Sequence, residues 1–277
     1  MSTFKDKVVV VTGAGGIICS VIAKDFARKG AKVALLDLNL DAATKASDDI
    51  NKEFPSSSKA FKCNVLDKDD IKRAHDEVLA SLGKCDILVN GAGGNNPKAN
   101  TDVEFHELNL DPSKRTFFDL DKAGIQFVFD LNIMGSLMPT QEFAKDMVGR
   151  KGCNIINISS MNSYRPLTKI PAYSGAKSAL SNFTQWLAVY FSKVNIRVNA
   201  IAPGFLVTNQ NRDLLFDKDG NPTERSKKIL RNTPLERFGD AEEMLGAISF
   251  LADEKAASFV TGIIIPIDGG FSAYSGV

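Results

Sequence analysis

Histidine and cysteine, the residues that most often bind zinc and other transition metals, are scarce in this sequence. Its 277 residues include two histidines and four cysteines. The cysteines (Cys19, Cys63, Cys85 and Cys153) form no CxxC pair and no zinc-binding pattern. We therefore expect no metal site, and we expect the cysteines to be reduced and buried. With only two histidines, the sequence offers few candidates for a Ser-His-Asp triad. His75 lies in a charged helical segment, where we expect it to be solvated.

The sequence also lacks a large excess of charge and a long apolar run. Its 34 basic and 33 acidic residues give a net charge of +1 at pH 7 and are interspersed along the chain. Bulk charge therefore predicts no nucleic-acid or membrane partner. No apolar run approaches the roughly 20 residues that span a bilayer. The first residues, MSTFKDK, lack the apolar core of a signal peptide, so we expect a cytoplasmic protein.

Apolar strand-like runs alternate with helix-like segments along the chain. The predicted strands are 8–11, 31–38, a stretch within 56–65, 85–90, 153–159, 196–202 and 262–268, and the predicted helices are 17–29, 41–54, 67–82, 125–148, 173–193 and 240–253. Strands joined through helices are parallel, and strands covered on both faces are nearly all apolar, as these are. The pattern predicts an α/β fold, a single Rossmann-type domain over residues 1–277. Its doubly wound three-layer sandwich would hold a parallel sheet of about seven strands.

Two segments interrupt this alternation. Residues 94–124 are long, polar and rich in turn residues, and residues 205–238 contain the turn signal DKDGNP. Both follow the carboxyl ends of predicted strands, where ligands bind in this class of fold. We expect both insertions to build or cover a substrate site, with an oligomer contact or a surface extension without a function as the alternatives.

The turn after the first strand, TGAGGIICS, has features of a dinucleotide-binding loop. Its glycines, Gly13, Gly15 and Gly16, leave room for a pyrophosphate close to the backbone. The N–H groups near Ile17 and Ile18, at the start of the next helix, can bind that anion. A glycine-rich turn alone is a weak signal, so the cofactor prediction depends on residues further along the chain.

Asp37 ends the second strand, 24 residues after Gly13. A carboxylate at this point can accept hydrogen bonds from both hydroxyls of the adenosine ribose, and it repels a 2′-phosphate. The residues that follow, LNLD, include no arginine that could compensate. The sequence therefore favours NAD(H) over NADP(H).

Tyr173 and Lys177 stand four residues apart in a predicted helix and so share one face. A nearby ammonium stabilises a phenolate and lowers the tyrosine pKa from its usual value near 10. The pair can therefore act as an acid/base unit. Ser160, at the end of a strand 13 residues before Tyr173, could bind the same substrate oxygen. A solvent-facing lysine beside a packed tyrosine is the alternative.

Together these motifs resemble the short-chain dehydrogenase/reductase family, in its order and with its spacing over essentially the whole chain. The matching pieces are Thr12-Gly13, Asn90-Gly91-Ala92-Gly93, Asn132, Ser160, Tyr173, Lys177, Pro203-Gly204 with Thr208, and the stretch PIDGGFS. One departure is local, because Ile17 and Cys19 stand where the family has its second and third glycines.

The resemblance implies a role for each catalytic residue. Tyr173 would exchange a proton with the substrate oxygen, and Lys177 would lower its pKa and hold the nicotinamide ribose. Ser160 would orient the substrate, and Asn132 would hold a water in a proton relay. The implied nucleotide contacts are Gly13, Gly15, Gly16, Ile17, Ile18, Asp37, Asn64, Val65, Asn90, Ala92, Gly93, Tyr173, Lys177, Pro203, Gly204 and Thr208.

Several stretches resemble one branch of this family, the D-mannonate oxidoreductases or fructuronate reductases, which interconvert D-fructuronate and D-mannonate. They include NGAGGNNPKA, SNFTQWLAVYF and APGFLVTNQNRDLLFDKDGNPTERSKKIL. For such a sugar acid, candidate contacts to hydroxyls are Asn95, Asn96, Asn162, Asn209, Gln210 and Asn211, and Ser160 is the candidate contact to the reacting oxygen. Candidates for the carboxylate are Lys98, Arg165 and Arg212.

Two alternatives stay open. One is a dehydrogenase for another sugar acid or polyol, such as a gluconate 5-dehydrogenase, and the other is an NAD-binding protein without catalysis. The resemblance also implies a homotetramer, the common assembly of the family.

Overall fold

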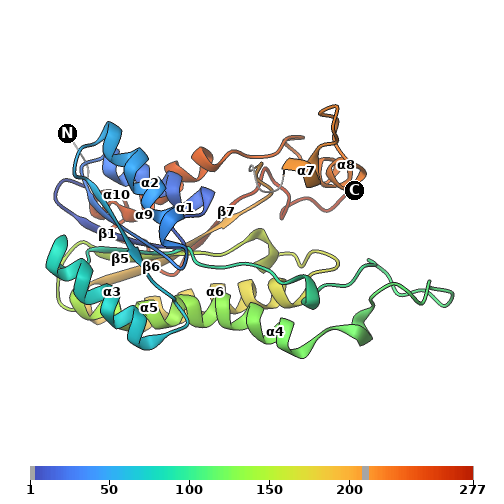
Figure 1. Ribbon diagram of the computed structural model, residues 1–277, viewed down its shortest axis with the longest axis horizontal. Helices are drawn as coiled ribbons and strands as arrows, with labels where there is room; N and C mark the ends of the chain where they lie inside the picture. The colour runs from blue at the N-terminus through green and yellow to red at the C-terminus, as the bar shows by residue number, and fades with distance from the viewer. Residues whose placement is uncertain (1–3, 208–211, 277) are drawn as a thin grey trace.

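Seven parallel strands form one sheet in the computed structural model, which describes residues 4–207 and 212–276 (Figure 1). The strands are β1 Val8–Thr12, β2 Lys32–Asp37, β3 Ser58–Lys62, β4 Ile87–Asn90, β5 Cys153–Ile158, β6 Ile196–Pro203 and β7 Ile264–Ile267. Their order is β3-β2-β1-β4-β5-β6-β7, and each neighbouring pair is parallel. The predicted Rossmann-type α/β fold is confirmed.

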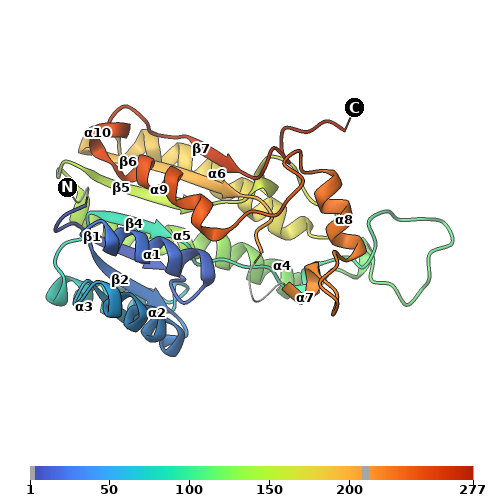
Figure 2. The same ribbon diagram turned by 90° about the horizontal axis from the view of Figure 1, so that it is seen from above.

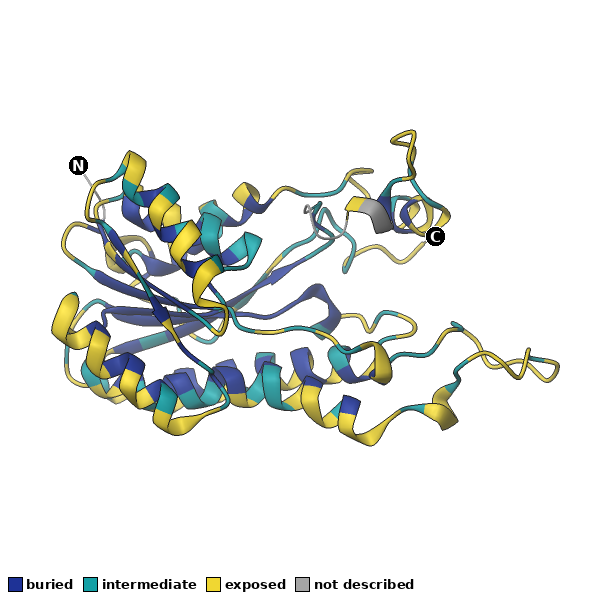
Figure 3. Ribbon diagram, viewed as in Figure 1, coloured by how far each residue is buried: buried dark blue, intermediate teal, exposed yellow. Residues whose placement is uncertain are grey.

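Helices cover both faces of the sheet, as Figures 1 and 3 show. One layer holds α1 (Ile17–Arg28), α2 (Leu40–Glu53), α9 (Leu245–Ala252) and α10 (Glu254–Ala257). The other holds α3 (Lys68–Ser81), α4 (Lys122–Phe129), α5 (Gly135–Met147) and α6 (Pro171–Tyr190). In β1, Val9 and Val11 belong to the apolar cluster under α1, whereas Val8 and Val10 belong to the cluster under α5. This alternation explains why the strand is apolar at every position.

Polar side chains fix where several helices begin. Asn39 accepts a hydrogen bond from the N–H of Ala42 at the start of α2, and Asp67 accepts two at the start of α3. These caps satisfy N–H groups that have no acceptor within the helix. The glycine-rich start of α1 differs, because its N-cap, Gly16, offers no side chain.

The prediction of one continuous α-helix over residues 125–148 is wrong, because its middle is not α-helical. A π-helical turn, Asp130–Met134, separates α4 from α5. Within it, the side-chain amide of Asn132 donates to the carbonyl of Val128 and to that of Gly94, each at 2.7 Å. A local π turn adds a residue to the helix and often occurs at a functional site. Here it carries Asn132 into the interior.

The two insertions extend beyond the carboxyl ends of the strands. Residues 94–124 are mostly exposed and form an arm that reaches past α8 before the chain enters α4 (Figure 2). Residues 205–238 contain the short helix α7 (Arg212–Leu215) and α8 (Glu224–Arg231). Across the described ranges, the helices are too short or too polar to span a bilayer.

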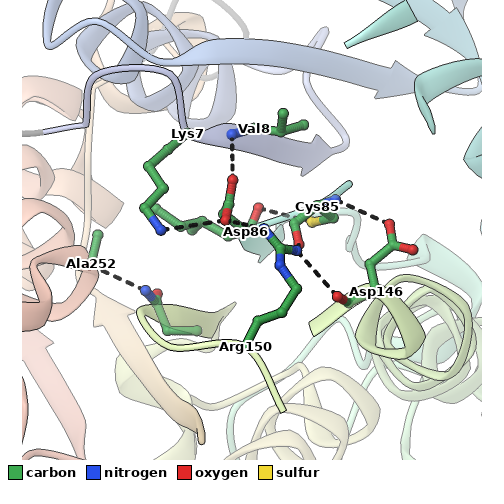
Figure 4. A network of polar contacts seen from close by, with 9 residues as sticks. Lys7, Val8, Cys85, Asp86, Asp146, Arg150 and Ala252 are labelled. Atoms are coloured by element: carbon green, nitrogen blue, oxygen red, sulfur yellow. Dashed lines mark hydrogen bonds and ion pairs between the residues drawn. The ribbon is translucent and has the colours of Figure 1, made fainter. Parts of the chain in front are cut away.

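A charged network closes the opposite end of the sheet (Figure 4). Asp86 accepts hydrogen bonds from the N–H of Val8 at 2.9 Å, from Lys7 at 3.3 Å and from Arg150 at 2.5 Å. The prediction that His75 is solvated is wrong, since it is 8% exposed and its Nε2 lies 3.2 Å from a carboxylate oxygen of Asp146. The sequence hid this contact because 71 residues separate the two side chains.

Candidate active site

Four predicted catalytic residues lie close to the carboxyl ends of β4 and β5. Ser160 follows β5, Tyr173 and Lys177 lie in the first turns of α6, and Asn132 lies in the π turn. A Cβ atom on Gly93, just after β4, would lie 2.8 Å from Oδ1 of Asn132 and 3.1 Å from Nζ of Lys177. Gly93 therefore leaves open the space where these two polar groups converge.

Lys177 is a buried cation. Its side chain donates to the carbonyl of Ile158 at 2.8 Å, it is 4% exposed, and it has no acidic partner among the described residues. Burial lowers its pKa from 10.5 to about 8. A lysine with this pKa can gain or lose a proton near neutral pH.

Tyr173 and Ser160 form the second half of this group. Burial raises the pKa of the Tyr173 phenol, and a hydrogen bond with Ser160 offsets part of the rise. Nζ of Lys177 lies 5.7 Å from the centre of the tyrosine ring and donates to the carbonyl of Ile158, so a lowering of the tyrosine pKa by Lys177 stays a prediction. The raised pKa keeps the Tyr173 phenol protonated at neutral pH.

The residues of the glycine-rich turn fit a nucleotide. Gly13 has a φ of +67°, and a Cβ there would lie 2.9 Å from the backbone of Ala92. The N–H of Ser20 donates to the carbonyl of Gly16. Helix geometry therefore leaves the three preceding N–H groups, those of residues 17–19, without an intrahelical acceptor. Such groups at a helix N-terminus bind phosphate.

The two departures from the family pattern have different surroundings. Ile18 packs against the core, whereas Ile17 is half-buried and is absent from the apolar clusters. Cys19 is buried, and a Cβ on Gly91 would lie 2.1 Å from its sulfur. Cysteine is therefore accommodated at the third glycine position because Gly91 has no side chain. Burial raises the pKa of Cys19 to about 12, so its thiol is neutral.

Asp37 joins the second strand to the glycine-rich turn. Its carboxylate accepts from the N–H of Gly15 at 2.9 Å and from that of Asn39 at 2.8 Å. A Cβ on Gly15 would lie 2.8 Å from the side chain of Ala42 and 3.1 Å from Asp37. Gly15 thus lets the turn approach a carboxylate at the edge of the proposed ribose site.

The remaining nucleotide candidates vary in accessibility. The amide of Asn90 is buried and donates to Thr140 and Asn157, each at 2.9 Å, so its side chain faces the core and not the site.

The other candidates lie at the ends of β3 and β6. Asn64 accepts from the N–H of Leu66 at 3.0 Å. Val65 is buried, Pro203 ends β6, and a Cβ on Gly204 would lie 2.6 Å from Asp268. Thr208 lies outside the described residues.

A cleft of about 780 Å³ lies between the arm, the loop before α6 and α8. Its charged lining residues are Asp102, Glu104, Arg115, Arg165, Lys169, Glu224, Arg225 and Lys228. Ser160 and Tyr173 do not line it, but the wall at residues 165–170 belongs to the loop that joins them. The cleft and the catalytic group are therefore linked by this loop.

Charge in this cleft is unevenly compensated. Arg115 pairs with Asp102, Lys228 with Glu104, and Glu224 with Lys227 outside the cleft. Arg165, Lys169 and Arg225 have no acidic partner in the part of the chain that the structure describes. Nε of Arg165 donates to the carbonyl of Ser272 at 2.7 Å. The cleft therefore suits an anionic ligand.

Among the predicted substrate residues that the structure describes, only Arg165 lines this cleft. Asn95 bonds to Asn100, Asn96 caps a short turn, Lys98 is exposed, Arg212 lies over the ring of Phe216, and Asn162 is buried. Residues 209–211 lie outside the described residues. Sequence reasoning missed Lys169 and Arg225, although both stand in basic stretches of the loop before α6 and of α8.

Comparison with known proteins identifies the class. A family model described as enoyl-(acyl carrier protein) reductase matches residues 13–272. An uncharacterized oxidoreductase of Haemophilus influenzae is 62% identical over 273 residues (99% of this chain and 95% of the relative). Another, from Bacillus subtilis, is 45% identical over 271 residues (98% and 96%). The chain belongs to the short-chain dehydrogenase/reductase family of oxidoreductases.

A solved structure agrees with this assignment. It is that of a proposed D-mannonate oxidoreductase from Haemophilus influenzae with bound NAD. It is 62% identical to this chain and superposes with a TM-score of 0.95, covering 99% of this chain and 97% of the other. The resemblance stated from the sequence motifs is confirmed.

Proposed function

We propose that this oxidoreductase uses NAD(H) to interconvert a keto sugar acid and its hydroxy acid, and that the pair is D-fructuronate and D-mannonate. The observation that carries the substrate class is the cleft with an excess of cations, one wall of which belongs to the loop that leads from Ser160 to Tyr173. A sugar acid brings a carboxylate for these cations. The similar chain described as a proposed D-mannonate oxidoreductase supports the particular pair.

The described groups can be assigned to steps of carbonyl reduction. A bound nicotinamide supplies the hydride to the carbonyl carbon. As the carbon–oxygen π bond breaks, Tyr173 gives its phenolic proton to the oxygen, to which Ser160 donates a hydrogen bond. Lys177, with a pKa of about 8, can then return a proton to Tyr173, and Asn132 would hold a water that links Lys177 to solvent.

Asp37 supports a preference for NADH over NADPH. Its carboxylate stands at the end of β2 and is tied to the N–H of Gly15. Ribose hydroxyls can donate hydrogen bonds to it. The negative charge of Asp37 would repel a 2′-phosphate, and the residues directly after β2 include no arginine that could offset this repulsion.

Three cations are available to hold the substrate carboxylate: Arg165, Lys169 and Arg225. Arg165 can bind a carboxylate through two parallel hydrogen bonds. Lys169 has a φ of +72°, a strained conformation for lysine, and its carbonyl accepts from the N–H of Thr101 in the arm. Strain of this kind concentrates at ligand sites. The arm and residues 205–238 would then form the walls of the substrate site.

Two further properties extend this proposal. We place the enzyme in the cytoplasm, where its four buried cysteines would stay reduced, and as a homotetramer like other family members. The alternative activity is oxidation or reduction of another sugar acid or polyol, such as 5-ketogluconate. A chain that only binds NAD is disfavoured by the convergence of Asn132 and Lys177 at Gly93.

A substrate panel tests the proposal. NADH oxidation is measured with D-fructuronate, tagaturonate, 5-ketogluconate and an acetoacetyl ester. We expect the highest kcat/KM for D-fructuronate. If another compound is reduced faster, the specific substrate assignment is wrong; if none is reduced, the proposed activity is wrong.

A matched pair of variants tests the carboxylate site. Arg165→Gln should raise KM for the keto acid about tenfold, since one charge-assisted contact is lost. Lys98→Gln is the control, because Lys98 is exposed and does not line the cleft. Equal effects of the two changes would place the carboxylate elsewhere.

A further inference from the structure

Asn162 is buried beside the two residues that handle the reacting oxygen. It lies in the 3₁₀ turn Met161–Ser163, directly after Ser160, and is 5% exposed. Its amide nitrogen donates to Oγ of Ser160 at 3.1 Å, and its backbone N–H donates to the same oxygen at 3.3 Å. Its amide oxygen accepts from the hydroxyl of Ser174 at 3.0 Å and from the N–H of Leu167 at 3.2 Å. These partners occupy both acceptor sites of the amide oxygen and one of the two amide hydrogens, so the predicted contact with a substrate hydroxyl stays a prediction for the second N–H.

The surroundings fix the orientation of this amide. The backbone N–H of Leu167 can only donate, so the atom that faces it must be the amide oxygen. The nitrogen must then face Ser160. Asn162 is therefore a donor to the serine.

Two donors to one hydroxyl determine what that hydroxyl does. A serine oxygen has two acceptor sites and one O–H. Asn162 occupies both acceptor sites of Ser160. The serine O–H is then available to donate to the reacting oxygen or to the phenol of Tyr173. The hydrogen bond with Ser160 lowers the pKa of Tyr173, as expected when the serine donates to the phenolate.

Asn162 also links the elements that carry these groups. Ser174 is the neighbour of Tyr173 in α6, and Leu167 lies in the loop between Ser160 and α6. We propose that Asn162 is a positioning residue that fixes Ser160 as a hydrogen-bond donor to the reacting oxygen and holds it in register with Tyr173. The inference rests on the proposed carbonyl chemistry but not on which sugar acid is reduced.

A double-mutant cycle tests this role. Asn162→Ala should lower kcat about 10- to 100-fold, since one oriented donor is misplaced, while KM for NADH stays unchanged. In a Ser160→Ala background the same change should have little further effect, because Asn162 acts through the serine. An equal loss in both backgrounds would show a merely structural role and overturn the proposal.

A matched control separates this role from the loss of any buried asparagine. Asn154, at the start of β5, is 0% exposed and donates to the carbonyl of Ala252 at 3.2 Å. Asn154→Ala should lower the melting temperature but leave kcat and the pH profile in place. Asn162→Asp keeps the oxygen facing Ser174 and Leu167 but replaces the donor to Ser160. It should therefore be as impaired as Asn162→Ala, and recovery of activity by the aspartate would contradict the proposal.

The pH response gives a readout that folding alone would not change. In alcohol oxidation, the rise of kcat/KM with pH follows formation of the Tyr173 phenolate. Its midpoint should move up by about half a pH unit or more in Asn162→Ala and stay in place in Asn154→Ala. If no substrate in the panel reacts, ultraviolet titration of the phenol, taken as the difference from Tyr173→Phe, measures the same shift. An unchanged midpoint would refute the role of Asn162 whether or not the proposed function stands.

Discussion

The two ends of the sheet bury polar groups in opposite ways. At the amino end, the carboxylate of Asp86 meets two cations, Lys7 and Arg150, and a backbone N–H. At the carboxyl end, Lys177 donates to a backbone carbonyl and has no acidic partner in the described part of the chain, and burial lowers its pKa to about 8. Buried charge is stable when paired and costly when alone. The difference shows which end is built for stability and which end retains groups ready to exchange protons.

The same contrast applies to histidine and tyrosine. His75 contacts the carboxylate of Asp146, which also accepts from the N–H of Cys85. Tyr173 has a hydrogen bond with a serine hydroxyl, and its pKa is raised by burial. The His75 contact joins α3 to α5, whereas the Tyr173 phenol lies beside Ser160, where it can give its proton to a substrate.

The largest expected effect is on chemistry at the carboxyl end. Tyr173→Phe removes the proton donor and should lower kcat about 10³-fold. Because the ring remains, the melting temperature should stay within about 2 °C, since losing one partly buried hydroxyl costs little. Steady-state kinetics with NADH fluorescence titration check this. Retained turnover would show that another group supplies the proton.

The amino end should show the reverse pattern. Asp86→Ala leaves Arg150 and Lys7 without their buried partner and should cost about 2–3 kcal/mol of unfolding free energy. Urea unfolding measures the loss. The kcat of the folded enzyme should not change. A fall in kcat larger than twofold would contradict the assignment of stability to the amino end and of chemistry to the carboxyl end.

Removing the buried cation at the carboxyl end should stabilise the protein while it abolishes turnover. The pKa of Lys177 is lowered to about 8 in the folded state, so below pH 8 the folded state must hold a charge that it disfavours. That cost is about 3 kcal/mol. Loss of the hydrogen bond to the carbonyl of Ile158 offsets about 1 kcal/mol of this cost. Lys177→Met should therefore raise the free energy of unfolding by about 2 kcal/mol at pH 7.

The stability advantage of Lys177→Met should fall as the pH rises. Between pH 8 and 10.5 the unfolded chain holds a proton on Lys177 that the folded chain has lost, so the stability of the native protein rises there relative to the variant. The advantage of Lys177→Met should therefore shrink across this window. Urea unfolding at pH 7 and pH 10 measures it, and a constant or reversed difference would mean that Lys177 is not strained by burial.

The smallest expected effect concerns cofactor choice. Asp37→Ala should weaken NADH binding about tenfold, because the ribose loses a charged acceptor, and should narrow the preference over NADPH. It also releases the N–H groups of Gly15 and Asn39. Asp41→Ala is the control, since Asp41 is exposed in the first turn of α2. If the preference for NADH over NADPH is unchanged in Asp37→Ala, Asp37 does not bind the adenosine ribose.

Local patterns made much of this molecule predictable. The apolar run 8–11 predicted β1 because alternate residues face the two helical layers. Tyr173 and Lys177 were predictable because an i, i+4 spacing puts them on one face of α6 whatever the rest of the chain does. These features depend on neighbours in sequence.

Features that depend on distant partners were not predictable. His75 finds Asp146 only when α3 and α5 pack together, and the π turn forms where Asn132 bonds to Gly94, 38 residues away. The proposed positioning role of Asn162 depends on its contact with Ser174, 12 residues away across the loop before α6. A pKa shift from burial, such as that of Lys177, likewise has no local sequence signal.

Hydride transfer at the carboxyl end is the central claim, and isotope transfer tests it most directly. The enzyme is incubated with D-fructuronate and NADH carrying deuterium on one face of nicotinamide carbon 4, and the product is analysed by mass spectrometry. We predict D-mannonate with one deuterium on the former carbonyl carbon from one labelled face and none from the other. Absence of labelled product from both faces would contradict the account.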